Sequence, residues 1–165
     1  MRQSLTAIAI TLLLSACVSG ASAGSPAATD LSGARKMRVD KNELINVGGW
    51  KLESAHGADR AGIDALFVEG SAYELKFDRD QLSVVGGCNQ LRGRYSGGKR
   101  MTFEVAIATR MACKDDRNLA DQRMSELLNA TYSAELLETQ PMRLRLTGDD
   151  GTVLIFAATP MGLDP

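Results

Sequence analysis

Apolar and polar residues alternate with a period of two along most of the chain after residue 46. In segment 71–77, for example, Tyr73, Leu75 and Phe77 share one face and the residues between them share the other. Successive side chains of a β-strand point to opposite faces of a sheet, so this pattern is typical of a strand with one buried face. It predicts short strands in segments 47–55, 71–77, 81–85, 89–95, 100–103, 105–109, 131–137, 142–146 and 152–157.

Polar and glycine-rich stretches separate these segments and predict the turns. Residues 79–80, 96–98 and 149–151 are expected to connect neighbouring strands, the last with Gly151 where a positive φ is needed. Segment 56–70 has no regular period. We expect a long loop there, with one turn of helix near Asp64.

The period changes to that of an α-helix in segment 114–129. Asp115 and Asp116 are expected to cap the helix and to place negative charge in its first turn, which suits the helix dipole. The helix is predicted to pack on the sheet through an apolar stripe. That stripe consists of Leu119, Ala120, Met124, Leu127 and Leu128, and the opposite, polar face consists of Arg117, Asp121, Gln122 and Glu126.

The order of these elements indicates the fold class. Strands follow one another before and after a single helix, which favours an antiparallel sheet over a parallel one. We therefore expect an α+β domain in which a curled antiparallel sheet of about eight short strands packs against one helix. The chain of 165 residues is long enough for one such domain.

The first residues have the features of an export signal. Arg2 is followed by an apolar stretch and then by Leu14-Ser15-Ala16-Cys17. The apolar stretch is too short to span a membrane. The ending resembles a bacterial lipobox, which implies cleavage after residue 16, acylation of Cys17 and a membrane anchor. Val18 is not the Asp that favours inner-membrane retention, so the resemblance implies the outer membrane, with the protein facing the periplasm.

Segment 18–40 is rich in Ser, Ala and Gly and has no apolar period. Such a composition is typical of a flexible tether. The predicted organisation is therefore a lipoprotein signal peptide over residues 1–16, a lipidated Cys17 with a flexible tether over 17–45, and a folded domain over 46–159.

Charge gives little indication of a partner. The net charge is −1, and removal of Arg2 with the signal makes it −2. Both signs are mixed along the chain without a basic block, which argues against nucleic-acid binding.

Several motifs together resemble the META domain of HslJ-like bacterial heat-shock lipoproteins. The stretches are a Trp-x-Leu strand, GGCNQLRGRY, IATRMAC, an acidic helix start and a final pair of strands. The resemblance covers about residues 46–159 and implies a small monomeric α+β domain linked to heat, antibiotic or envelope stress, with no defined catalytic mechanism. The residues that carry it are Trp50, Gly87, Cys88, Asn89, Gly93, Tyr95, Thr109, Arg110, Met111 and Cys113.

Cys88 and Cys113 remain for pairing once Cys17 carries lipid. An oxidising compartment favours a disulfide between them, which would close a loop of about 25 residues and stabilise the fold by about 3 kcal/mol. Two buried free thiols and a redox-active pair are the alternatives. The redox interpretation is disfavoured because no Cys-x-x-Cys spacing is present to lower a thiol pKa.

Other polar residues give weak indications of chemistry. Asn89 and Arg110 flank the cysteines and are interpreted as structural, with Arg110 paired to Asp115 or Asp116. His56 is the single histidine and has no cluster of ligands at metal-binding spacing. We expect no catalytic residues, no metal and no cofactor.

Three functions are compatible with this sequence. The first is a non-enzymatic envelope lipoprotein that binds another envelope protein under stress. The second is a small-molecule binding or inhibitor module in the periplasm, with a groove between the sheet and the helix. The third, an enzyme, is least supported.

Overall fold

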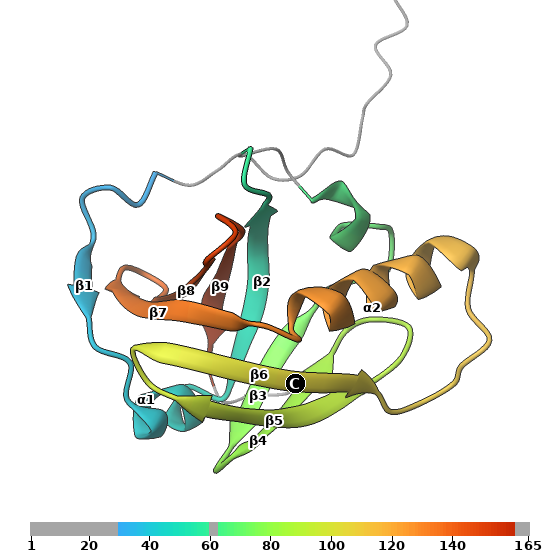
Figure 1. The fold of residues 1–165 in the computed structure, drawn as a ribbon, viewed down its shortest axis with the longest axis horizontal. Helices are drawn as coiled ribbons and strands as arrows, with labels where there is room; N and C mark the ends of the chain where they lie inside the picture. The colour runs from blue at the N-terminus through green and yellow to red at the C-terminus, as the bar shows by residue number, and fades with distance from the viewer. Residues whose placement is uncertain (1–29, 60–62, 161–165) are drawn as a thin grey trace, which may run out of the picture.

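The structure is a computed structural model that describes residues 30–59 and 63–160 (Figure 1). The predicted signal peptide, Cys17 and the first part of the predicted tether lie outside these residues. The described helices are α1 (Lys41–Asn46), the 3-10 helix η1 (Asp64–Leu66) and α2 (Asp115–Leu127). The described strands are β1 (Arg35–Met37), β2 (Gly49–His56), β3 (Glu74–Asp78), β4 (Gln81–Val85), β5 (Leu91–Gly97), β6 (Arg100–Ile107), β7 (Thr131–Glu138), β8 (Arg143–Gly148) and β9 (Val153–Thr159).

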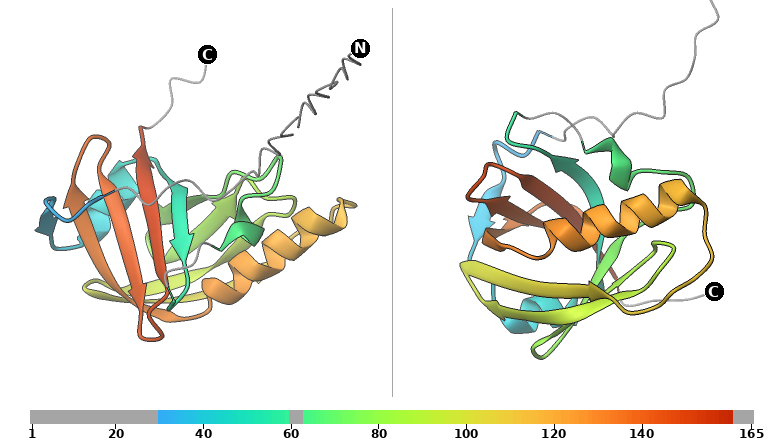
Figure 2. Two further views of the ribbon diagram at one scale, coloured as in Figure 1. Left: turned by 90° about the horizontal axis from the view of Figure 1, so that it is seen from above. Right: turned by 45° about the vertical axis from the view of Figure 1, so that its right-hand side comes forward.

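Eight of these strands form one closed antiparallel barrel (Figures 1 and 2). Their order is β7-β6-β5-β4-β3-β2-β9-β8, and β8 pairs with β7 to complete the ring. Closure removes the free sheet edges that would otherwise invite aggregation. The predicted α+β class and the curled antiparallel sheet are confirmed.

The alternating residues of the strands fill the barrel. Tyr73, Leu75 and Phe77 are all buried, as their common face predicted. Phe77 and Tyr95 meet edge to face with ring centroids 4.8 Å apart, a favourable aromatic arrangement. The interior is therefore a packed core.

One edge of β7 is divided between two partners. Residues 131–133 pair with β6, and residues 136–138 pair with β1. Between them, the Ala134 N–H donates to the Lys99 carbonyl at 2.8 Å. A notch therefore separates β1 from the β5–β6 turn.

β6 continues beyond its pairing with β7, where a side chain takes the place of a strand. The Asn129 side chain accepts a hydrogen bond from the Val105 N–H at 2.8 Å and donates one to the Val105 carbonyl at 2.6 Å. This amide satisfies backbone groups that would be left open at a strand edge. Segments 100–103 and 105–109, predicted as separate, thus form one strand that ends at Ile107.

α2 lies against β6 and η1 (Figure 1). The apolar stripe is confirmed for Ala120, Met124 and Leu127, which are buried. Leu119 is 61% exposed, so its assignment to the stripe is wrong. The predicted aspartate cap is also wrong, because the N-cap is Lys114 and makes no side-chain capping bond. The two aspartates instead occupy the first turn, where they favour the helix dipole.

The folded part of the chain begins earlier than predicted. β1 and α1 lie within the expected tether, so the prediction of a flexible segment up to residue 45 is wrong for these elements. The Asp40 side chain caps α1, Leu44 is buried, and the Trp50 indole donates to the Leu44 carbonyl at 3.0 Å. A short helix can persist because tertiary contacts of this kind stabilise it.

None of the helices in the described ranges, 30–59 and 63–160, is long and apolar enough to cross a membrane.

Candidate functional site

A buried carboxylate lies at the centre of the predicted motif residues. Asp121 of α2 has no exposed surface. It accepts hydrogen bonds from the Tyr73 hydroxyl at 2.7 Å, the Cys88 N–H at 3.2 Å, the Asn89 N–H at 2.6 Å and the Asn89 side-chain amide at 3.0 Å. Four donors replace the water that a buried carboxylate would lose. Asp121 therefore ties α2 to the chain that enters β5.

The sequence predicts Asp121 on the solvent face of the helix, which is wrong because the structure buries it. A signal was present: residues 121, 124 and 128 follow the spacing of one helix face. A carboxylate is expected at the surface because Asp is rarely fully buried, although its position on the helix indicates the buried face.

The Tyr73 hydroxyl shares this environment. Burial, reinforced by the hydrogen bond to Asp121 and by its charge, raises the pKa of Tyr73 far above the usual value of 10. The hydroxyl therefore remains protonated and acts as a permanent donor to the carboxylate.

Asn89 connects Asp121 to the segment that precedes α2. Its side-chain oxygen accepts from the Met111 N–H at 2.8 Å and from the Thr109 hydroxyl at 3.3 Å. The same Thr109 hydroxyl accepts from the Gln90 N–H at 2.9 Å. Asn89 is thus structural, as interpreted from the sequence, and it fixes the course of segment 108–114.

A disulfide between Cys88 and Cys113 holds the other end of this segment, with the two Cα atoms 6.2 Å apart. The predicted pairing is confirmed, and the interpretation as two free thiols is wrong. The Asn118 side chain also donates to the Cys113 carbonyl at 3.2 Å. Segment 108–114 is therefore held at both ends.

Gly87 allows the backbone to approach the carboxylate closely. A Cβ atom at this position would lie 2.2 Å from Asp121 Oδ1 and 2.7 Å from Tyr73 Cε1, too close for either contact. Gly93 is restricted in the same way, since its Cβ would lie 1.9 Å from the Glu104 carbonyl oxygen. Both motif glycines are explained by packing.

The remaining motif residues separate into buried and exposed ones. Trp50 and Tyr95 belong to the core, whereas Met111 is 62% exposed. Arg110 is exposed too and makes no ion pair with any residue that the structure describes. The predicted pairing of Arg110 with Asp115 or Asp116 is therefore wrong.

Large exposed apolar side chains occur in this segment and in the two elements that flank it in the sequence. Ile107, Met111 and Leu119 are 41%, 62% and 61% exposed, and they are the large apolar residues that stand out from the described surface. They lie at the end of β6, in segment 108–114 and in the first half of α2. We call them the apolar trio.

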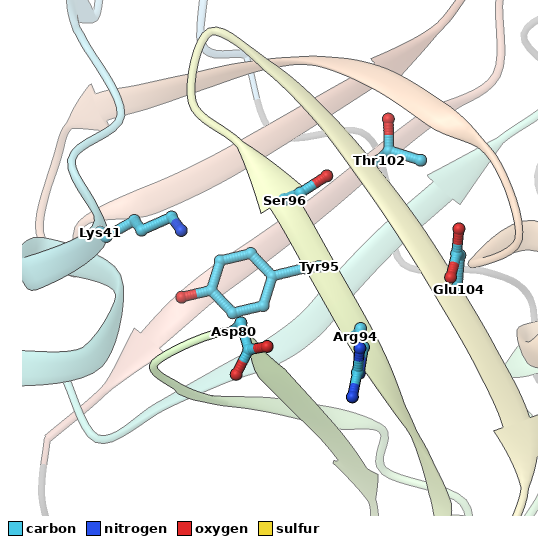
Figure 3. A pocket seen from close by; sticks show the side chains of 7 residues that line it. All are labelled: Lys41, Asp80, Arg94, Tyr95, Ser96, Thr102 and Glu104. Atoms are coloured by element: carbon cyan, nitrogen blue, oxygen red, sulfur yellow. The ribbon is translucent and has the colours of Figure 1, made fainter.

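A cavity of about 260 Å³ lies elsewhere, beside α1 and the end of β5 (Figure 3). Tyr95 extends between Lys41 and Asp80 there, with the Lys41 ammonium 5.6 Å from the centre of the ring. The Tyr95 hydroxyl is buried without a hydrogen-bond partner. Burial, with the nearby charges of Asp78 and Asp80, raises its pKa. This is a separate polar cavity, away from the predicted groove between sheet and helix.

Arrangements for metal or acid–base chemistry are not evident in the part of the chain that the structure describes. It contains no group of three or more His, Cys, Asp or Glu residues that could hold a metal ion. Both ring nitrogens of His56 are buried without a hydrogen-bond partner. Glu53 of β2 forms a two-bond ion pair with Arg143.

The fold and the network around Asp121 define a small barrel domain in which a disulfide holds the segment leading into its helix. Residues 42–160 match the META domain family, and the chain belongs to this family. Its fold is similar to that of a protein from Burkholderia xenovorans solved by NMR, with a TM-score of 0.59, 19% identity, and 81% of this chain and 98% of that one covered. No curated protein matches the chain.

Proposed function

We propose that this protein is a lipid-anchored lipoprotein of the bacterial outer membrane whose META domain binds another envelope protein under stress, without catalysis. The observation that carries this proposal is the apolar trio, of which Met111 lies on a segment that is fixed by a disulfide and by Asn89. Where exposed apolar groups form one patch, they are typical of a surface for protein contact. Fixing the segment beforehand lowers the entropic cost of binding.

Two features support export to the envelope. The lipobox-like sequence ends in Cys17. The disulfide fits the same interpretation, because disulfides persist in oxidising compartments and are rare in the bacterial cytoplasm. Membrane binding that lasts requires more than one acyl chain, which a fully processed lipoprotein cysteine provides.

The anchor is tested by the intact mass of protein purified from membranes. We expect a chain that begins at Cys17 and carries acyl groups, and a Cys17→Ala variant that leaves the membrane fraction. Val18→Asp should shift the protein to the inner membrane while leaving acylation intact. A full-length chain without acyl mass would contradict the anchor.

The binding surface is tested by a photo-crosslinking residue placed at Met111 in cells. We expect reproducible adducts with one envelope protein, more abundant after heat or antibiotic stress, and their loss when Leu119→Asp is added. The control position is Lys51, an exposed residue of β2. Equal adducts from both positions, or none from Met111, would contradict the proposal.

The cavity beside Tyr95 favours a second candidate, a small-molecule binding module. A buried hydroxyl without a partner next to a charged cavity is suited to a polar ligand. Ligand-observed NMR with a panel of envelope metabolites and antibiotics tests it. Binding that is weakened in a Tyr95→Phe variant would support this function, and silence across the panel would count against it.

A further inference from the structure

The notch along β7 contains a second cavity, of about 390 Å³. We call it the β1 groove. Its floor is apolar, since Val39 and Ala134 are buried and Met37 is partly buried. Its rim is charged. The residues that line it are Lys36, Met37, Arg38, Val39, Lys99, Ala134 and Glu135.

The rim carries more positive charge than its acid can balance. Lys36 lies 3.1 Å from Glu135, and this carboxylate is shared with Arg145. Arg38 and Lys99 are exposed, and neither forms an ion pair within the described residues. Two uncompensated cations above an apolar floor are complementary to a phosphate that is joined to an apolar group.

The groove also lies where the chain enters the fold. Residues 18–34 separate Cys17 from β1. Even when fully extended, 17 residues reach no more than about 60 Å. An anchor at Cys17 therefore keeps β1 within that distance of the membrane surface.

β1 and the apolar trio lie at opposite ends of the domain. In all three ribbon views β1 is at one extreme, and the start of α2 with segment 108–114 is at the other (Figures 1 and 2). A domain that rests on the membrane through the β1 groove would therefore direct the apolar trio away from the membrane, toward other envelope proteins.

We propose that the β1 groove binds the headgroup of an anionic phospholipid in the membrane that holds Cys17. Arg38 and Lys99 contact the phosphate, and the apolar floor accommodates the adjoining glycerol and upper acyl chain. Basic residues near a membrane surface attract anionic lipids, and this attraction weakens as salt screens it. The inference rests on the proposed anchoring, although the binding itself does not require an acyl group.

The test uses the mature chain with Cys17→Ser, so that no acyl group contributes. Co-sedimentation compares vesicles of phosphatidylcholine with vesicles of equal parts phosphatidylcholine and phosphatidylglycerol. We expect preference for the anionic vesicles. Arg38→Gln with Lys99→Gln should lower partitioning into them by about 25-fold, given about fivefold for each charge lost. Glu135→Gln, which frees Lys36, should raise it by about fivefold.

A matched control removes the same charge elsewhere. Lys51→Gln with Arg92→Gln changes exposed residues of β2 and β5 that do not line the groove. We expect this variant to partition like the parent chain.

Three results would overturn the proposal. The first is equal binding to both kinds of vesicle, and the second is an equal loss in the control variant. The third is displacement by soluble glycerol phosphate, which would identify a free phosphate as the ligand. Whether Cys17 is acylated in cells is measured separately, by the intact mass of the protein. A failure of the proposed anchor can therefore be distinguished from a failure of lipid binding by the β1 groove.

Discussion

At the scale of single residues, the stability of the fold depends on the hydrogen bonds that Asp121 accepts. Fully buried carboxylates are rare unless each oxygen is paired. Here one side chain satisfies the Tyr73 hydroxyl and two consecutive backbone N–H groups, at Cys88 and Asn89. Loss of such a group lowers the stability of the fold mainly because its buried donors are then left without an acceptor.

Asp121→Ala is expected to lower the free energy of unfolding by about 3 kcal/mol or more, because several buried donors lose their acceptor together. Urea denaturation followed by circular dichroism measures this change. Gln122→Ala, at the adjacent exposed position, is the control and should stay within about 0.5 kcal/mol of the parent. Similar effects of both substitutions would contradict the role given to Asp121.

The ion pairs of Glu135 predict that the stability of the fold decreases at acid pH. Burial raises its pKa, but hydrogen bonds from Arg145 and Lys36 and their charges outweigh burial, so the pKa is lowered from 4.5. The stabilisation is therefore present above the unfolded-state pKa and is lost as pH falls through the lower, folded-state value. Since the pair is partly exposed, Glu135→Gln should cost less than about 1 kcal/mol at neutral pH. Stability profiles of variant and parent should converge in acid.

At the scale of elements, segment 108–114 has no regular secondary structure and depends on its two attachments. The disulfide fixes its end at Cys113, and Asn89 fixes its middle at Met111. The segment thus behaves as part of the barrel, although Arg110, Met111 and Ala112 within it are exposed. The conformation of the segment is therefore determined by the residues that hold it.

Asn89→Ala is expected to loosen this segment and to expose it to protease. Trypsin should cleave after Arg110 several-fold faster than in the parent, because cleavage requires local opening of the chain. Peptide mapping over time measures the rate. Asn46→Ala, which changes an exposed residue at the end of α1, should leave the rate unaltered.

The disulfide that holds the same element also stabilises the fold, because it restricts the conformational freedom of the unfolded chain. Cys88→Ser with Cys113→Ser should lower the free energy of unfolding by about 3 kcal/mol in the chain-entropy description. Reduction of the parent protein should reproduce the change in a denaturation experiment. A double variant as stable as the parent would contradict this role.

At the scale of the whole molecule, the periodicity of apolar positions, with two residues per repeat in the strands and a helical repeat in segment 114–129, is sufficient to predict most strands, the helix and the fold class. It could not predict closure of the barrel, because pairing of β7 with β8 and with β6 depends on curvature that no local pattern records. β1 was missed for a related reason: its three residues are ordered by pairing with β7. Asp121 and Asn129 act through distant partners, so composition alone made them look like surface residues.

The closed core also predicts the behaviour of the molecule in alkali. All three tyrosines of the chain have raised pKa values, mainly through burial, and that of Tyr132 is about 12. Their stabilisation is complete below the unfolded-state pKa near 10 and is lost as pH rises further. Absorbance at the tyrosinate band should therefore rise only well above pH 10 in the native protein, whereas the protein in guanidinium should titrate near pH 10. Smooth titration of the native protein near 10 would contradict this packing.

Closure of the barrel has a kinetic consequence. β2 and β9 are neighbours in space, with Trp50 opposite Ala158, but they are almost at the two ends of the folded sequence. Contacts between residues so far apart in the chain are slow to form, because a long loop must close before any of them can stabilise the fold. A growing chain consequently cannot finish this barrel until its last strand is available, and the unfinished sheet keeps two open edges until then.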